Sequence, residues 1–128
     1  SEIQQEFDLV TQKKVSFSFT PHLSPMFRGI LSTIYLDLLP KKKNKIIHKE
    51  LIKFYKKTSF VKVLKINKLL STNDVINTNN CHISICRSKD KKKIIILSSL
   101  DNLIKGGSGQ AIQNFNLLFG FNEKTGLH

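Results

Sequence analysis

The side chains that could do chemistry in this 128-residue sequence are few and widely spaced. Cys81 and Cys86 lie in or beside a predicted strand, whereas a nucleophilic thiol needs a local feature that lowers its pKa and an acid/base partner in reach. Their odd spacing directs them to opposite faces of a strand, so no bridge is expected between them. Two cysteines without a second pair also provide no metal framework. We interpret both as partly buried structural thiols in a reducing compartment.

Arg28 is the first candidate for binding. It precedes Gly29 at the start of a predicted strand, and its planar fork suits a carboxylate or a phosphate. The alternative is an arginine that pairs with a carboxylate of a nearby loop, and the sequence leaves the two open. His22 lies between Pro21 and Pro25, where a hydrogen-bonded structural histidine is the first interpretation and a substrate contact the second.

A glycine-rich stretch, formed by Gly106, Gly107, Ser108 and Gly109, precedes a predicted helix. Free backbone N–H groups at the positive end of a helix favour an anion or the polar edge of a cofactor. The alternative is a turn that needs glycine only for close packing. The spacing does not fit the Gly-x-Gly-x-x-Gly fingerprint of a dinucleotide site, so this chain is not a Rossmann half.

The net charge of +12 raises the question of a nucleic-acid partner. The lysines concentrate in two runs, residues 41–45 and 89–93, that fall between predicted elements and do not alternate with aromatic residues. Solvated loops explain these runs better than a nucleic-acid site does. No apolar run is long enough to span a bilayer and no secretory signal is visible, so we expect a cytoplasmic protein.

Hydrophobic periodicity divides the chain into short elements. Apolar residues at helical spacing alternate with period-two stretches rich in Val, Ile and Phe. The expected elements are a helix over residues 3–10, strands over 15–19 and 30–38, a helix over 47–55, a short strand over 61–63, a loop over 71–80, strands over 83–85 and 94–97, and a helix over 111–119 that ends at Gly120.

The order of these elements predicts the fold class. Pairs of strands without an intervening helix argue for an antiparallel or mixed sheet, with the helices packed on one face, in an α+β domain. No linker and no internal repeat is visible, and the length suits one hydrophobic core. Residues 1–128 are therefore expected to form a single domain.

Two segments carry a family resemblance. Residues 19–35 (FTPHLSPMFRGILSTIY) resemble the Pro-x-x-x-Pro-x-x-Arg-Gly-Ile segment of N-acetyl-γ-glutamyl-phosphate reductases. Residues 101–116 (DNLIKGGSGQAIQNFN) resemble that family's Asp-Asn-Leu-x-Lys-Gly-x-x-Gly-Gln-Ala-x-Gln-Asn segment. Residues 1–3 resemble the end of a His-Arg-His-x-x-Glu-Ile motif, and the chain's close is similar to the usual C-terminus of the family.

The resemblance implies a C-terminal substrate-binding and dimerisation domain like that of glyceraldehyde-phosphate dehydrogenase. Members of the reductase family that the chain resembles reduce N-acetyl-γ-glutamyl phosphate with NADPH through a cysteine thioester, in arginine biosynthesis. The family's nucleophile lies in an Asn-Pro-Gly-Cys motif that does not occur here, and the acid/base histidine is implied upstream of Ser1. The dinucleotide-binding domain and the nucleophile segment are thus absent, no catalytic residue is assigned, and the chain alone is expected to be inactive.

The resemblance also implies roles for residues of this chain. Arg28, His22 and Glu2 would serve the acyl-phosphate substrate, with Glu2 orienting a missing histidine. Residues 106–109 would approach the nicotinamide of an NADP that is bound mainly by the absent half, and the domain would form a homo-oligomer. The alternatives are a fragment of an aspartate-semialdehyde or aminoadipyl-phosphate type of reductase, or a free-standing basic module that binds nucleic acid.

Overall fold

The structure, a computed structural model, describes residues 2–12, 15–40 and 43–128. Ser1 of the opening motif and Lys41 and Lys42 of the first lysine run lie outside the described residues. The elements, in chain order, are α1 (Glu2–Thr11), β1 (Ile30–Asp37), α2 (Asn44–Tyr55), β2 (Val61–Val63), the 3₁₀ turn η1 (Thr72–Asp74), β3 (Cys81–Arg87), β4 (Lys93–Leu100), the π-helical turn η2 (Ile104–Ser108) and α3 (Gly109–Leu118).

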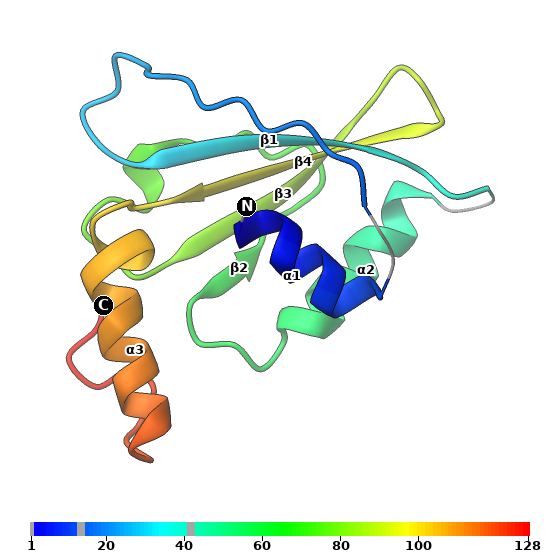
Figure 1. Cartoon of the computed structure of the whole chain (residues 1–128). Coiled ribbons are helices and arrows are strands. Elements are labelled where there is room, and N and C mark those ends of the chain that lie inside the picture. Colours follow the sequence, from blue (N-terminus) through cyan, green and yellow to red (C-terminus); the bar gives the residue numbers. More distant parts are fainter. Residues whose placement is uncertain (1, 13–14, 41–42) are drawn as a thin grey trace.

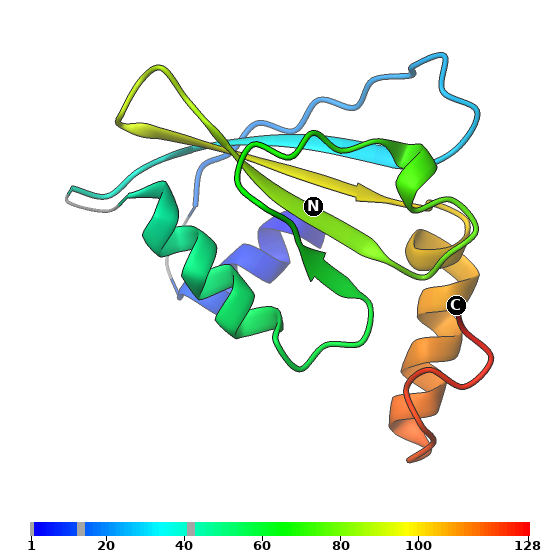
Figure 2. The same cartoon turned by 180° about the vertical axis from the view of Figure 1, so that it is seen from behind.

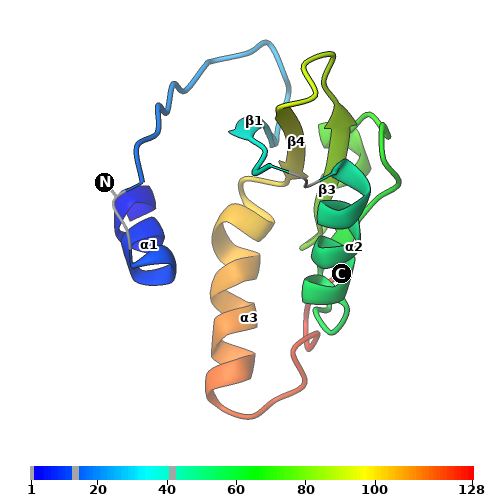
Figure 3. The same ribbon diagram turned by 90° about the vertical axis from the view of Figure 1, so that its right-hand side faces the viewer.

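The four strands form one mixed sheet in the order β1-β4-β3-β2. β4 pairs antiparallel with both β1 and β3, and β2 pairs parallel with β3. Helices α1, α2 and α3 lie on one side of this sheet (Figure 3), whereas the segment between β2 and β3 crosses its other side (Figure 2). The predicted α+β class, with a mixed sheet, is confirmed.

Local chemistry accounts for two of the connections. In the β3–β4 turn, the Asp90 carboxylate accepts a hydrogen bond of 2.8 Å from the backbone N–H of Lys92, an Asx-type turn that closes the hairpin within the second lysine run. At the end of α3, Gly120 has φ 72° and the N–H of Phe121 donates to the carbonyl of Asn116 at 2.8 Å. This Schellman geometry confirms Gly120 as the helix stop.

The core is small and centred on β3 and β4. Ile85 and Ile94 are at most 1% exposed, and Val75 and Phe60, from segments outside these two strands, are buried as well. By contrast, β1 is one of the two edge strands and keeps exposed residues on both faces, among them Ile34 and Tyr35. Figure 1 shows this strand along the upper border of the sheet. The domain therefore presents more apolar surface than a self-contained protein of this size needs.

The predicted strand over residues 15–19 is wrong. These residues form no ladder with any strand of the sheet. The alternation that suggested a strand has another cause: the ring of Phe17 packs on Phe7 of α1, with 5.4 Å between centroids, while Phe19 is 67% exposed. Alternation reports which side chains are covered, and it does not by itself supply a partner strand.

Candidate functional site

The centre of the candidate site is a two-point pair between Arg28 and Asp101. Arg28 Nε donates to Asp101 Oδ1 at 2.9 Å, and Arg28 Nη2 lies 2.9 Å from Asp101 Oδ2. Asp101 is fully buried, whereas 22% of the Arg28 side chain is exposed. The sequence left open whether Arg28 pairs with a loop carboxylate, and the structure shows that it does. Its predicted substrate contact stays a prediction.

Asp101 also binds backbone donors from two further segments. Its Oδ2 accepts from the N–H of Asn77 at 2.8 Å, and its Oδ1 accepts from the N–H groups of Leu103 and Ile104 at 2.9 and 3.2 Å. Burial alone would raise the pKa of the Asp101 carboxyl, but the guanidinium and the three backbone donors outweigh it and hold that pKa below its usual range. Asp101 is therefore an ionised hub that joins three parts of the chain.

The neighbouring residues repeat this connection. The N–H of Gly29 donates to Asn102 Oδ1 at 2.9 Å. Gly29 directly follows Arg28 in the chain, and Asn102 directly follows Asp101. Gly29 has φ 106°, and a Cβ at this position would lie 2.7 Å from Thr72 Cβ. Only glycine satisfies both the backbone angle and this close approach. The two segments that carry the family resemblance are thus in direct contact.

The glycine-rich stretch is a π-helical turn rather than a loop with free N–H groups. The N–H of Gly106 donates to the carbonyl of Asp101 at 2.9 Å, that of Ser108 to Leu103 at 3.0 Å, and that of Gly109 to Ile104. The Ser108 hydroxyl donates to the Leu103 carbonyl as well. Our expectation of several unbonded donors here is wrong, because the backbone reaches five residues back and satisfies them internally.

Close packing explains one of the glycines. A Cβ at Gly109 would lie 2.5 Å from Asn79 Oδ1 and 2.6 Å from Ile104 Cγ2, although its backbone is ordinary helix. At Gly106 the nearest atom, Leu100 Cδ1, would be 3.4 Å from such a Cβ. The start of α3 is therefore pressed against the chain just before β3, and Gly109 permits this contact.

A polar network holds the other side of this turn. Lys105 Nζ and Asn79 Nδ2 both donate to Gln113 Oε1, at 2.6 and 2.9 Å, and Gln113 Nε2 donates to Glu123 Oε1 at 2.7 Å. The Lys105 ammonium also lies 5.6 Å from the centroid of the Phe60 ring. Burial lowers the pKa of Lys105, and the nearby Cys81 and Glu123 oppose that shift. Lys105 is thus fixed within the domain rather than extended into solvent.

The remaining predicted residues are not brought to this centre by any recorded contact of the described residues. His22 is exposed and its Nδ1 lies 3.1 Å from the carbonyl oxygen of Thr20. Glu2 is exposed in the first turn of α1, where it complements the helix dipole. Cys81 and Cys86 are free and half-buried on β3, as expected for structural thiols.

A separate buried group lies further along β3. His82 and Ser99 are directly opposite each other on β3 and β4. Both ring nitrogens of His82 and the Ser99 hydroxyl oxygen are buried without a hydrogen-bond partner among the described residues. Burial lowers the pKa of His82, Lys62 lowers it further, and Asp74 opposes the shift. The neutral form of this histidine is therefore favoured more than that of an exposed histidine.

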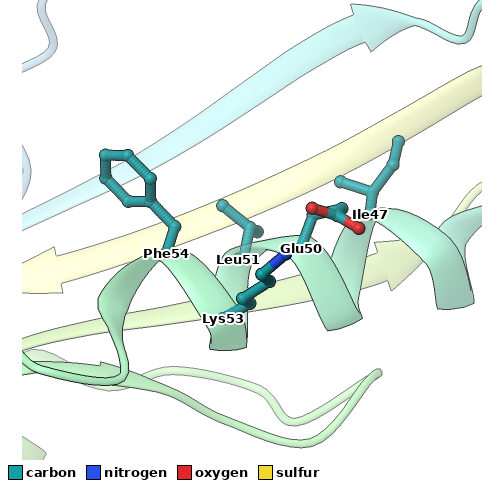
Figure 4. Close-up of a pocket in the computed structure, with 5 residues that line it drawn as sticks. All are labelled: Ile47, Glu50, Leu51, Lys53 and Phe54. Carbon is teal, nitrogen blue, oxygen red and sulfur yellow. The ribbon is translucent and has the colours of Figure 1, made fainter.

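A shallow hollow of about 460 Å³ lies on α2. Figure 4 shows the five side chains that line it, all from this one helix: Ile47, Glu50, Leu51, Lys53 and Phe54. It contains none of the predicted site residues and only two charged groups. Within the described ranges, no cluster of three or more His, Cys, Asp or Glu side chains could hold a metal ion, and no helix is long and apolar enough to cross a membrane.

Three residues of the site escaped the sequence interpretation as site residues: Asp101, Asn79 and Gln113. A signal existed for Asp101, because an acidic residue directly after the last residue of a buried strand is unusual unless it is paired. The partners lie up to 73 positions apart, so periodicity could not show that these side chains meet.

The fold and the site together define a class: an α+β domain in which an arginine-bearing strand start and a glycine-rich helix start are joined through a buried aspartate. Residues 1–102 match the family described as semialdehyde dehydrogenase, dimerisation domain. The chain belongs to this family.

Curated relatives agree with that assignment. The chain is 48% identical to an N-acetyl-γ-glutamyl-phosphate reductase of Vesicomyosocius okutanii over 98% of its length, and 46% identical to one of Clostridium botulinum (strain Eklund 17B) over 99%. It is 44% identical, over 98% of its length, to a protein of Arabidopsis thaliana named a probable chloroplastic N-acetyl-γ-glutamyl-phosphate reductase. These matches cover 36%, 37% and 31% of the respective relatives, so the chain spans about a third of their length.

Proposed function

We propose that this chain is the substrate-binding and oligomer-forming part of an N-acetyl-γ-glutamyl-phosphate reductase, and that it is inactive by itself. One observation carries the proposal: the identity of 44–48% to proteins of that name extends over 98–99% of the chain. Both segments of the original resemblance lie within this region. They are also the segments that the structure joins through Arg28 and Asp101.

In the proposed reaction, a cysteine from the rest of the enzyme attacks the acyl carbon of the substrate and expels phosphate. NADPH, bound mainly outside this chain, would supply the hydride that reduces the resulting thioester, and release of the cysteine thiol would leave the semialdehyde. The residues of this chain bind and orient the substrate. We propose that Arg28 receives one of its anionic groups, because a guanidinium binds carboxylates and phosphates in a fixed planar geometry. His22, in the loop between Pro21 and Pro25, remains a proposed substrate contact, and Glu2 is proposed to orient a histidine from the rest of the enzyme.

The glycine-rich turn would make only a minor contact with the cofactor. The N–H groups of Gly106, Ser108 and Gly109 are already bonded within the chain, so they do not form a cradle for a diphosphate. Gly106 and Gly107 are exposed and have no side chains, which fits contact with a flat ring edge. This supports our proposal that NADP is bound mainly by a part of the enzyme outside this chain.

The exposed apolar surface supports a further proposal about the oligomeric state. The side chains of Leu31, Ile34 and Tyr35 on β1 are 42–68% exposed, and large exposed apolar surfaces are typical of contacts with another domain or a second copy. Together with the family's description as a dimerisation domain, this supports a homo-oligomer. We propose the cytoplasm as the location, although the Arabidopsis relative is named as chloroplastic.

The test is a chimera in which residues 1–128 replace the matching 37% of the Clostridium botulinum reductase. We expect NADPH-dependent reduction of N-acetyl-γ-glutamyl phosphate by the chimera and none by the 128-residue chain. The parent enzyme is the positive control, and the chimera without its cysteine nucleophile is the negative control. A correctly folded chimera that shows no turnover beside an active parent would contradict the proposal, as would turnover by the chain alone.

A further inference from the structure

The carboxylate of Asp101 uses only one edge of the Arg28 guanidinium. A guanidinium has five N–H donors in a fixed plane, one on Nε and two on each terminal nitrogen. Asp101 Oδ1 accepts from Nε and Asp101 Oδ2 lies 2.9 Å from Nη2, and these two nitrogens form the lateral edge of the group. The end-on edge, formed by Nη1 and the second N–H of Nη2, meets no acceptor within the described part of the chain. It can accommodate a second oxyanion in the same two-point manner.

The buried partner fixes where that second edge points. Asp101 cannot turn, because its two oxygens are also held by the N–H groups of Asn77, Leu103 and Ile104. Arg28 is in turn followed by Gly29, whose N–H is bound to Asn102. Both the side chain and the backbone of the arginine segment are therefore tied to the start of the segment 101–109. The Arg28 side chain as a whole keeps 22% of its surface exposed, unlike its fully buried partner.

We propose that Asp101 is a positioning residue: it orients Arg28 so that the end-on edge of the guanidinium binds a carboxylate or phosphate group of the substrate. This inference rests on the proposed function and deepens it. Asp101 does not touch the substrate. It holds the guanidinium in one orientation and links that orientation to the glycine-rich turn through the N–H groups that it binds.

The first experiment compares Arg28→Lys and Asp101→Asn in the chimera described above. We expect each variant to raise the KM for N-acetyl-γ-glutamyl phosphate by about 10- to 100-fold, the effect of losing a charge-assisted pair. The KM for NADPH and kcat should change far less. The double variant should be no worse than the more affected single variant, because both changes remove one shared arrangement. A purely structural role would instead lower the thermal midpoint and leave the substrate KM unchanged.

Matched controls separate charge loss from orientation. Asp37→Asn removes a carboxylate that is 86% exposed and lies 3.6 Å from Lys93 at the far end of β1, so it should change no kinetic constant. Arg28→Lys leaves the three backbone N–H donors of Asp101 in place and should therefore keep the fold. It still tests the proposal if Asp101→Asn does not fold. An unchanged substrate KM in Arg28→Lys overturns the proposal.

The reverse reaction identifies which anion binds, because the semialdehyde carries the carboxylate and phosphate is a separate substrate. A raised KM for the semialdehyde in Arg28→Lys assigns the carboxylate, and a raised KM for phosphate assigns the phosphoryl group. If neither value changes, the proposal fails.

If the unmodified chimera is inactive, only the proposed function is contradicted. The orientation of Arg28 by Asp101 can then still be tested in the 128-residue chain. Inorganic phosphate should then shift the NMR signals of the Arg28 guanidinium in a saturable way, and Asp101→Asn should abolish that shift. A linear shift of equal size in both proteins overturns the proposal.

Discussion

Gly109→Ala tests the close contact between α3 and the chain before β3. The new Cβ would lie 2.5 Å from Asn79 Oδ1, 2.6 Å from Ile104 Cγ2 and 2.9 Å from the Ile104 carbonyl oxygen. Because Gly109 has helical angles, alanine should gain about 1 kcal/mol of helix propensity. Overpacking of a tight contact opposes this with about 1–3 kcal/mol, and displacement of the buried Asn79 from Gln113 adds about 1–3 kcal/mol. The expected result is a net loss of about 2 kcal/mol.

Urea unfolding and thermal melts of the 128-residue chain measure this loss. For a domain of this size, about 2 kcal/mol corresponds to a fall of roughly 8 °C in Tm. Gly106→Ala is the matched control, because its Cβ would meet no atom nearer than Leu100 Cδ1 at 3.4 Å, and its stability should stay within about 0.5 kcal/mol of the original. If Gly109→Ala is as stable as Gly106→Ala, the packing argument at the start of α3 is refuted.

Two further predictions concern other parts of the fold. Gly29→Ala combines a φ of 106° with a Cβ 2.7 Å from Thr72 Cβ, so it should lower the free energy of unfolding by about 3 kcal/mol. Gly120→Ala has a φ of 72° but open space around the new Cβ, so it should lower that free energy by only about 1 kcal/mol. Equal losses in urea unfolding would show that the contact with Thr72 is unimportant. Burial lowers the pKa of His82 below its ordinary value of 6.5, so the unfolded chain binds the proton first, and the free energy of unfolding should fall as the pH drops below about 6.5. His82→Gln should reduce this slope; an identical slope in both proteins would assign the effect to other groups.

Much of the fold was predictable because its elements are amphipathic in a simple way. α2 and α3 have apolar residues at helical spacing, and β4 contains the run Ile94–Leu97, which the structure places in the centre of the sheet. The segment 71–80 was expected as a loop, and it contains one short 3₁₀ turn. The strand over 15–19 was predicted wrongly, since Phe17 is covered by a helix rather than by a neighbouring strand.

The candidate site was predictable only in part. Arg28 and the glycine-rich stretch stood out by residue type and by resemblance, but the role of Asp101 depends on three segments meeting in space. The π-helical turn was also missed, because its hydrogen bonds reach five residues back and no sequence pattern distinguishes them from an ordinary helix start. Burial of polar groups depends on tertiary contacts that periodicity does not report.

The long reach of the site contacts has a consequence for the order of folding. The pairs Arg28–Asp101 and Gly29–Asn102 each join residues 73 positions apart, whereas the β3–β4 hairpin closes over a few residues. Closing a long loop costs more entropy than closing a short one, so local pairs form first. We expect β3 and β4 to pair early and β1 to add to β4 later. The two motifs that carry the resemblance would then meet in one of the last steps, on a scaffold that is already formed.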